Sequence, residues 1–150
     1  MEGNFKNKYD LSRFVVAHKM DFEKAYSEIA NGRKTSHWMW YIFPQLKELG
    51  KRDTARFYGI KSYGEAKAFL EDEYLGGNLI KISKVLLTLD NNDPVYVFDG
   101  KTDAIKLRSS MTLFAIVAGE NSVFEEVLKK YFGGKYDGAT LGILRKKAGS

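Results

Sequence analysis

Apolar residues recur at three- and four-residue intervals along most of the chain, which is the spacing of one face of an α-helix. Two such runs near the start follow Asp10 and Asp21, either of which can cap a helix, and Asn31-Gly32 ends the second run. Met20 marks either a break between two helices or a bend within one. The apolar faces comprise Leu11, Phe14, Val15 and His18 in the first run and Phe22, Ala25, Tyr26 and Ile29 in the second.

Further helices are predicted wherever a capping residue precedes apolar residues at this spacing. The clearest starts are two capping boxes, Ser62 with Glu65 and Ser122 with Glu125, because each pair can satisfy unpaired amides at a helix start. The remaining candidate caps are Ser36, Asp53, Asp93, Thr102 and Asp137.

Helix-breaking residues divide these segments. Pro44 disfavours continuation of the helix that Ser36 opens. Gly76-Gly77 and Gly133-Gly134 are expected to separate helices. Residues 95–98 are the one plausible strand, and four residues make no sheet alone. We therefore predict an all-α fold, a compact single-domain multi-helical bundle of about seven to nine short helices.

Composition supports an ordinary core and excludes several kinds of site. The chain has 150 residues, of which 44% are hydrophobic, so its bulk is not disordered. The absence of Cys excludes a disulfide scaffold, a thiol nucleophile and thiolate zinc sites. His18 and His37 are the only imidazoles, which excludes a three-histidine metal site. We expect neither a metal nor a cofactor.

The start of the sequence shows no targeting signal. No apolar stretch follows Met1, and no uncharged stretch approaches the roughly 20 apolar residues that a membrane helix needs. The sequence therefore predicts a cytoplasmic protein that does not bind membranes. The single domain is expected to span 1–150, with frayed ends at 1–8 and 145–150.

The positive charge is concentrated in one segment. The net charge is +5, and residues 33–61 alone hold an excess equal to that of the whole chain. Aromatic residues, including Trp38 and Trp40, are interleaved with these cations, as in sites for nucleotides or single-stranded nucleic acid. Alternatively, the aromatics are core and the cations solvated. The cations are Arg33, Lys34, Lys47, Lys51, Arg52, Arg56 and Lys61, against Glu48 and Asp53.

The first candidate site is the polar stretch that precedes the Trp-rich helix, with Lys34, Ser36 and His37. A helix N-terminus exposes unpaired amides, so cations and hydroxyls there favour a phosphate or a carboxylate. His37 is the candidate general acid or base, because its ordinary pKa lies near neutrality. Alternatively, Ser36 is only a cap and His37 packs against an aromatic neighbour.

The second candidate site lies in the helix after Thr102. Five polar residues flank its core stripe, either lining a pocket or forming a solvated face, and an arginine among them can bind a carboxylate or phosphate with two hydrogen bonds. They are Lys106, Arg108, Ser109, Ser110 and Thr112.

A third candidate is Gln45, with Asp10 and Arg13 as possible partners, although a cap and an inter-helix ion pair are the simpler roles for those two. The acidic run Glu71, Asp72 and Glu73 lacks a histidine partner and is expected to be a solvated face. No catalytic triad order, Walker loop, dinucleotide fingerprint or zinc-protease motif occurs.

Several strings resemble the uncharacterised bacterial family DUF1810. The resemblance covers nearly the whole chain and implies a small all-α domain without an established activity. Some members are labelled calpastatin, but an inhibitor of that kind is expected to be disordered and repetitive, and this chain is neither. The strings include Gly32-Arg-Lys-Thr-Ser-His-Trp-Met-Trp-Tyr-Ile-Phe-Pro-Gln-Leu and Lys106-Leu-Arg-Ser-Ser-Met-Thr-Leu-Phe.

We rank three functions. The first is a binding domain for a small anionic or nucleotide-like ligand, with or without an enzymatic activity, which requires the two long strings to share a pocket. The second is a protein-interaction module that uses the Trp-rich basic surface. Nucleic-acid binding ranks third, because the net charge is modest and no nucleic-acid motif occurs. The ligand residues proposed are Lys34, Ser36, Trp38, Trp40, Gln45, Lys106, Arg108, Ser109, Ser110 and Thr112, with His37 as the catalytic candidate.

Overall fold

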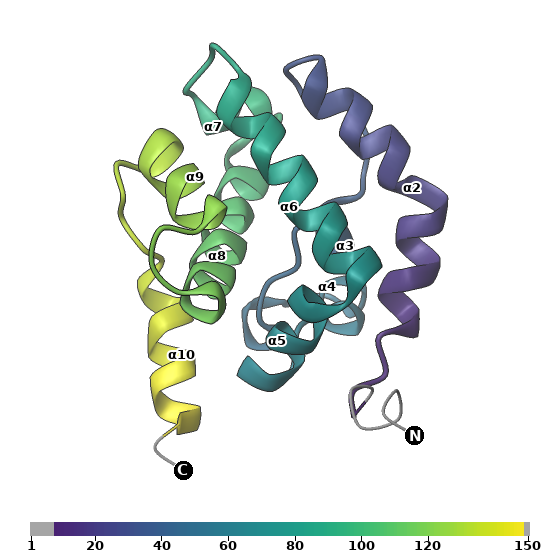
Figure 1. The fold of residues 1–150 in the computed structure, drawn as a ribbon. Helices are drawn as coiled ribbons and strands as arrows, with labels where there is room; N and C mark the ends of the chain where they lie inside the picture. The colour runs from purple at the N-terminus through teal and green to yellow at the C-terminus, as the bar shows by residue number, and fades with distance from the viewer. Residues whose placement is uncertain (1–7, 149–150) are drawn as a thin grey trace.

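The centre of the molecule is the long helix α8 (Lys101–Ala118), seen in a computed structural model that describes residues 8–148 (Figure 1). Four helices pack against it: α5 (Tyr63–Glu71), α7 (Pro94–Val97), α9 (Val123–Phe132) and α10 (Gly138–Ala148). Because α8 is surrounded, every residue from 109 to 115 is buried. Ser109, Ser110 and Thr112 therefore lie inside the molecule and not on a solvated face.

A second pair of long helices covers this centre. α6 (Glu73–Thr88) packs against α2 (Ser12–Ala30), α5 and α9. The chain between α2 and α5 contains only short elements: α3 (Met39–Ile42), the 3-10 turn η1 (Lys47–Leu49) and α4 (Asp53–Phe57). Residues 8–148 thus contain nine α-helices and no strand, which confirms the predicted all-α single domain.

Aromatic rings connect the helices through the core. Phe69 contacts Phe14 edge-on, with ring centroids 5.0 Å apart, and contacts Phe114 at 5.6 Å. Phe114 in turn lies 5.8 Å from Phe124, so the rings join α2, α5, α8 and α9. Each ring is almost fully excluded from water, and burial of such large apolar surfaces is the main driving force for this packing.

Four of the predicted caps bind helix amides. Ser62 Oγ accepts a hydrogen bond from the Glu65 amide at 3.1 Å, and Ser122 Oγ accepts one from the Glu125 amide at 3.2 Å. Asp93 caps α7 in the same way. Asp137 accepts the amide of Thr140 in α10. Since these bonds satisfy donors that a helix start leaves unpaired, local sequence fixes these boundaries.

α2 is one continuous helix, so the predicted cap at Asp21 is wrong. The core face continues past Met20 without a change of phase, and nothing interrupts the backbone hydrogen bonds. Asp10 does serve the start of this helix, because its carboxylate accepts the Ser12 amide at 2.9 Å. Asp21 instead accepts a hydrogen bond from the hydroxyl of Tyr41 on α3.

Gly76-Gly77 does not separate two helices, because both glycines lie inside α6. The boundary between α5 and α6 falls at Asp72, whose carboxylate accepts the Leu75 amide at 2.9 Å. A Cβ at Gly76 would overlap the carbonyl oxygen of Leu70, so this glycine allows the end of α5 to approach α6 closely.

Asn31 and Gly133 end α2 and α9 as predicted, but three other boundary predictions and the predicted frayed C-terminal end are wrong. Residues 95–98 belong to α7 and its C-cap and not to a strand. α8 begins after Gly100, so Thr102 does not cap it. Ser36 is not a cap either, because α3 begins only at Met39. Residues 145–148, expected to be frayed, are helical, whereas 1–7 and 149–150 lie outside the described residues.

Candidate functional site

The two long strings meet in space. Lys34 Nζ lies 2.8 Å from the carboxylate of Asp103 on α8. One turn later on α8, Lys106 Nζ lies 5.6 Å from the ring centroid of Trp40 on α3. The geometric condition for a shared site, that segment 33–45 and α8 lie side by side, is therefore met, but only part of each string faces solvent.

Lys34 is an internal residue and not a ligand-binding cation. Its side chain is 5% exposed, and its Nζ donates to the carbonyl of Ser36 at 2.6 Å besides the pair with Asp103. The ammonium also lies 5.0 Å from the ring centroid of Trp38, which is fully buried. With its charge balanced inside the fold, Lys34 is available to no external anion.

The anion expected beside Ser36 is supplied by the chain itself. Glu28 Oε1 on α2 accepts the Thr35 amide at 2.8 Å, the Ser36 amide at 2.9 Å and the Trp38 indole at 2.9 Å. Burial alone raises the pKa of Glu28, but the hydrogen bonds from these three residues lower it to about 2. The amides and the indole of this segment are therefore paired with a carboxylate of the chain itself.

Neither histidine lines the cleft between the α3–α4 connection and α8. His37 is exposed, and no aromatic ring lies against it in the described part of the chain. His18 is buried, with Nε2 2.8 Å from the carbonyl of Tyr41 and Nδ1 3.1 Å from the amide nitrogen of Asn78. This arrangement fits the neutral ring, with Nε2–H donating and Nδ1 accepting, and burial lowers the pKa of His18.

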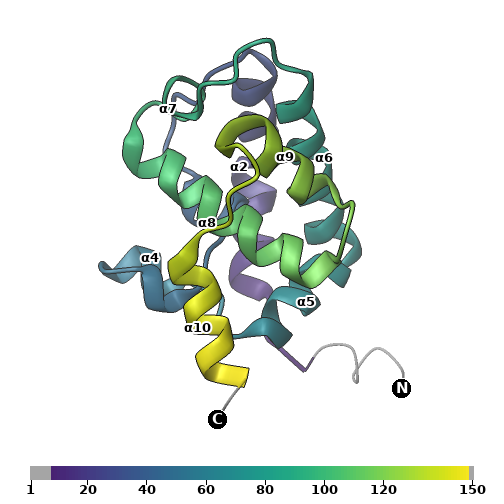
Figure 2. The same cartoon turned by 90° about the vertical axis from the view of Figure 1, so that its left-hand side faces the viewer.

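A cleft of about 690 Å³ lies between the α3–α4 connection, α8 and the start of α10. Of the helices that border it, α4 and α10 lie below α8 in the view of Figure 2. Its lining combines the Trp40 ring with three cations, Lys51, Arg52 and Lys106. The other lining residues are Gln45, Leu49, Gly50, Ala55, Thr102, Ile105, Ser109, Asp137 and Ala139.

Four of the residues proposed from the sequence line this cleft: Trp40, Gln45, Lys106 and Ser109. His37, Lys34, Ser36 and Trp38 do not, for the reasons given above. Sequence reasoning did not single out Lys51-Arg52 as site residues, although the charge excess of segment 33–61 contained the signal.

Arg108, Ser110 and Thr112 do not line the cleft. Arg108 donates to the carbonyls of Lys135 and Tyr136, at 3.0 and 2.8 Å. Thr112 Oγ1 accepts the Asp137 amide at 2.8 Å. These two side chains therefore hold the α9–α10 connection against α8. Ser110 is fully buried, and its Oγ has no hydrogen-bond partner among the described residues.

Comparison with known proteins identifies the family. The profile described as "Protein of unknown function (DUF1810)" matches residues 8–144. The chain belongs to the DUF1810 family. It is 39% identical to the conserved hypothetical protein Rv1873 from Mycobacterium tuberculosis, whose 1.38 Å crystal structure superposes with a TM-score of 0.89 over 93% of this chain and 99% of that one. No curated protein matches the chain.

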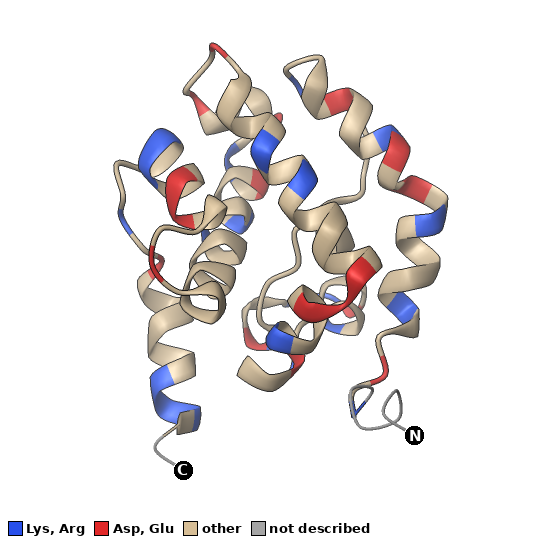
Figure 3. Ribbon diagram, in the orientation of Figure 1, with Lys and Arg blue, Asp and Glu red and all other residues tan. Residues whose placement is uncertain are grey.

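The family assignment confirms the resemblance and the all-α fold, and it names no ligand. Within residues 8–148 of this DUF1810 protein, no helix is long and apolar enough to cross a membrane. The same residues contain no group of three or more His, Cys, Asp or Glu that could hold a metal ion. The acidic run 71–73 lies at the α5–α6 junction, where Asp72 is a helix cap (Figure 3).

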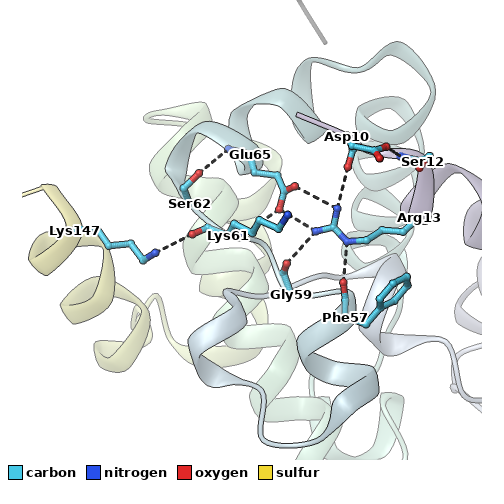
Figure 4. Close-up of polar contacts among 9 residues, drawn as sticks. All are labelled: Asp10, Ser12, Arg13, Phe57, Gly59, Lys61, Ser62, Glu65 and Lys147. Carbon is cyan, nitrogen blue, oxygen red and sulfur yellow. Dashed lines mark hydrogen bonds and ion pairs between the residues drawn. The ribbon is translucent and has the colours of Figure 1, made fainter. Parts of the chain in front are cut away.

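Arg13 and Asp10, the possible partners of Gln45 in the third candidate site, have structural roles in this DUF1810 protein. The Arg13 guanidinium forms a two-pronged pair with Glu65, at 2.9 and 3.2 Å, and donates to the carbonyls of Asp10, Phe57 and Gly59 (Figure 4). Glu65 is only 1% exposed. The inter-helix ion pair expected for Arg13 is thus present, and it fixes the start of α2 to the α4–α5 connection.

Part of the positive charge of residues 33–61 is neutralised by acidic residues from elsewhere in the chain. Arg33 pairs with Asp99 at 2.9 Å, and Lys34 pairs with Asp103, so acids outside the segment neutralise both. In contrast, Lys51 and Arg52 form no ion pair with any described residue. The cleft carboxylate, Asp137, is occupied by hydrogen bonds from within the fold. The mouth of the cleft is therefore positive.

Proposed function

We propose that the cleft binds a small nucleotide-like anion, with the base against Trp40 and the phosphate groups at Lys51, Arg52 and Lys106. The observation that carries the proposal is the position of one partly exposed aromatic ring beside three cations in a single cleft. The volume of about 690 Å³ is in the range of small-molecule sites.

The phosphate end of the ligand is assigned to the cations. Lys51 and Arg52 lie between Gly50, which ends η1, and the first residue of α4, so these two short elements fix where both side chains leave the backbone. Lys106 approaches from α8, and its pair with Asp103 is long, at 3.8 Å, so its charge is only partly neutralised. Lysine and arginine together suit a phosphate, since one supplies a point charge and the other a planar fork of donors.

The base end is assigned to Trp40 and Ile105. Ile105 is 62% exposed at the edge of the cleft, and a stacked base would cover such apolar surface. Gln45 and Thr102 add polar groups that can hydrogen-bond a base or a sugar. No histidine is found among the lining residues, and the one hydroxyl–carboxylate contact there, from Ser109 Oγ to Asp137, belongs to the hydrogen bonds that hold the start of α10, so the proposal is for binding.

The protein-interaction alternative has less support. It relied on a Trp-rich surface, whereas Trp38 is fully buried and only Trp40 reaches the surface. A single partly exposed Trp at the wall of a concave cleft favours a ligand that enters the cleft over a flat protein partner.

The test uses the two tryptophans as reporters. The protein is titrated with ATP, AMP and pyrophosphate. The two nucleotides should give a saturable change in tryptophan fluorescence, because Trp40 is the accessible tryptophan. Calorimetry measures the affinity independently. The Trp40→Phe variant should lose the optical signal. Arg52→Ala and Lys106→Ala should each weaken nucleotide binding about tenfold, the effect of removing one charge-assisted hydrogen bond.

The matched control is Lys24→Ala, which removes an exposed cation from α2, outside the cleft. Its affinity should equal that of the unaltered protein. Calorimetry without a saturable isotherm for either nucleotide at millimolar concentration would overturn the proposal, as would an equal loss of affinity in the Lys24 variant.

A further inference from the structure

A second hollow, of about 400 Å³, lies where α4 meets the start of α2. It repeats the combination found in the cleft, an exposed aromatic ring beside cations. The ring is that of Phe57, which is 60% exposed, and the cations are Lys47, Arg56 and Lys61. The rest of the lining consists of Asp10, Ser12 and Arg13, which are labelled in Figure 4.

The cations of this second hollow are available to a ligand. Lys47, Arg56 and Lys61 form no ion pair with any described residue. Glu48 is the nearest acid in the chain to Lys47, and it pairs with Lys147 at 2.7 Å. The acid inside the hollow, Asp10, accepts the amide of Ser12. The hollow therefore has a net positive lining even with Arg13 committed to Glu65.

The cleft and the second hollow share one wall. Within residues 47–61, residues 49–52 and 55 line the cleft, and the residues on either side of them, Lys47 before and Arg56, Phe57 and Lys61 after, line the hollow. Arg52 belongs to the cleft and Arg56 to the hollow, and the Arg56 amide donates to the Arg52 carbonyl at 3.0 Å. Arg52 is the N-cap of α4 and Arg56 lies four residues later within it, so this hydrogen bond closes the first turn of the helix. Arg56 Nη1 also lies 3.4 Å from the carbonyl of Gly50 in the cleft.

From this juxtaposition we infer that the ligand is a single-stranded nucleic acid, which extends from the cleft across α4 into the second hollow. One base stacks on Trp40 and another on Phe57, and the intervening phosphates lie along Arg52 and Arg56. Aromatic platforms joined by a track of cations are the usual means of binding single strands, because every base has a stackable face and every link a negative charge.

The geometry disfavours a duplex. Unpaired bases can enter separate hollows, whereas bases stacked within a double helix cannot. α4 has five residues and carries no polar row long enough to read a major groove. A mononucleotide would fill the cleft alone and leave the second hollow without a role. This inference rests on the proposed function, since it assigns the cleft to the first nucleotide of the strand.

The experiment compares ligands of increasing length. Thymidine monophosphate, a dinucleotide and longer oligothymidylates are titrated against the full chain at about 100 mM salt, where exposed charges are screened over roughly 10 Å. Affinity should rise at least tenfold between the mononucleotide and an oligonucleotide of about four residues, which spans both hollows. A duplex of the same sequence should bind more weakly.

The deciding variant is the triple change Lys47→Ala, Arg56→Ala and Lys61→Ala. It should abolish the gain with length and leave mononucleotide affinity unchanged. It should also reduce the slope of log affinity against log salt by about 2, because each phosphate that a cation neutralises on a single strand contributes about 0.7 to that slope. Phe57→Leu should remove part of the gain, about tenfold, without changing the salt slope.

The control removes the same charge elsewhere, with Lys24→Ala, Lys67→Ala and Lys84→Ala, three exposed lysines that line neither hollow. Equal losses of affinity in the two triple variants would overturn the inference, and so would an equally tight duplex. If the mononucleotide binds but length adds nothing, the inference fails and the proposed function stands. If the mononucleotide does not bind at all, both fail.

Discussion

The Glu28 carboxylate offers the sharpest test of how this fold is held together. One oxygen accepts three hydrogen bonds from the segment between α2 and α3, at 2.8 to 2.9 Å. Lowering the pKa of Glu28 from 4.5 to about 2 corresponds to about 3 kcal/mol of stabilisation at neutral pH. Because the carboxylate is partly exposed and solvent screens it, we expect about 2 kcal/mol.

The perturbation is Glu28→Gln, which keeps an acceptor oxygen and removes the charge. Urea unfolding at pH 7 should show a free energy of unfolding lower by about 2 kcal/mol. Glu28→Ala should cost about 3 kcal/mol, since it leaves the buried Trp38 indole and two amides without their acceptor. The matched control is Glu23→Gln on an exposed position of the same helix, which should change stability by less than about 0.5 kcal/mol.

The pH dependence provides the second readout. The pKa of Glu28 is depressed in the folded protein, so its stabilisation is fully present above pH 4.5 and is lost as the pH falls from there towards about 2. The difference between the unaltered protein and Glu28→Gln should therefore shrink below pH 4.5, and other carboxylates cancel from that difference. Equal stabilities at pH 7, or a difference that persists unchanged to pH 3, would refute the reasoning.

Three further predictions concern the core. Burial lowers the pKa of His18 below 6.5, so the unfolded state takes up the proton first and stability should fall as the pH drops below 6.5. Urea unfolding between pH 7.5 and 5.5 should show this decrease in the free energy of unfolding. The His18→Gln variant should lose the decrease, and the control His37→Gln should retain it. Gly76→Ala should destabilise by more than about 2 kcal/mol because its Cβ meets backbone, whereas Gly77→Ala, with open space around it, should stabilise α6 by about 1 kcal/mol in the same assay. Glu65→Gln leaves the Arg13 charge buried without its partner and should cost about 3 kcal/mol, seen in calorimetry as a drop in Tm of about 10 °C; an unchanged Tm would contradict the assigned role.

The sequence predicts the helical class and most long helices because both depend on local rules. Ser62, Ser122 and Asp137 bind the amides that the capping rules assign to them. The same rules give the wrong result at Gly76. This glycine leaves space for the carbonyl of Leu70, which is a tertiary contact that a local sequence pattern does not contain. A glycine pair inside a helix therefore looks like a stop until the neighbouring helix is known.

The candidate site likewise has a part that local sequence predicts and a part that only tertiary contacts reveal. Residue chemistry predicts a bound phosphate or carboxylate beside Ser36, whereas the amides there donate to Glu28, eight residues earlier on another element. Only the fold shows whether such a group is consumed internally. Sequence alone equally could not separate Lys34, which is buried against Asp103, from Lys51, which no acid among the described residues neutralises.

This distinction changes what the family resemblance means for function. In the long strings that carry it, Lys34, Trp38, Ser110 and Thr112 are buried or nearly so, and Arg108 holds a loop. Such residues keep a core and its polar contacts in place, so a resemblance carried by them is mainly evidence for a shared fold. Trp40, Gln45 and Lys106 are the parts of the strings that line the cleft, and the other cations of the two hollows lie in residues 47–61, where most of them are exposed. If the proposed function is correct, substitution of these exposed cations should change binding and leave the fold intact, whereas most substitutions in the strings should change both.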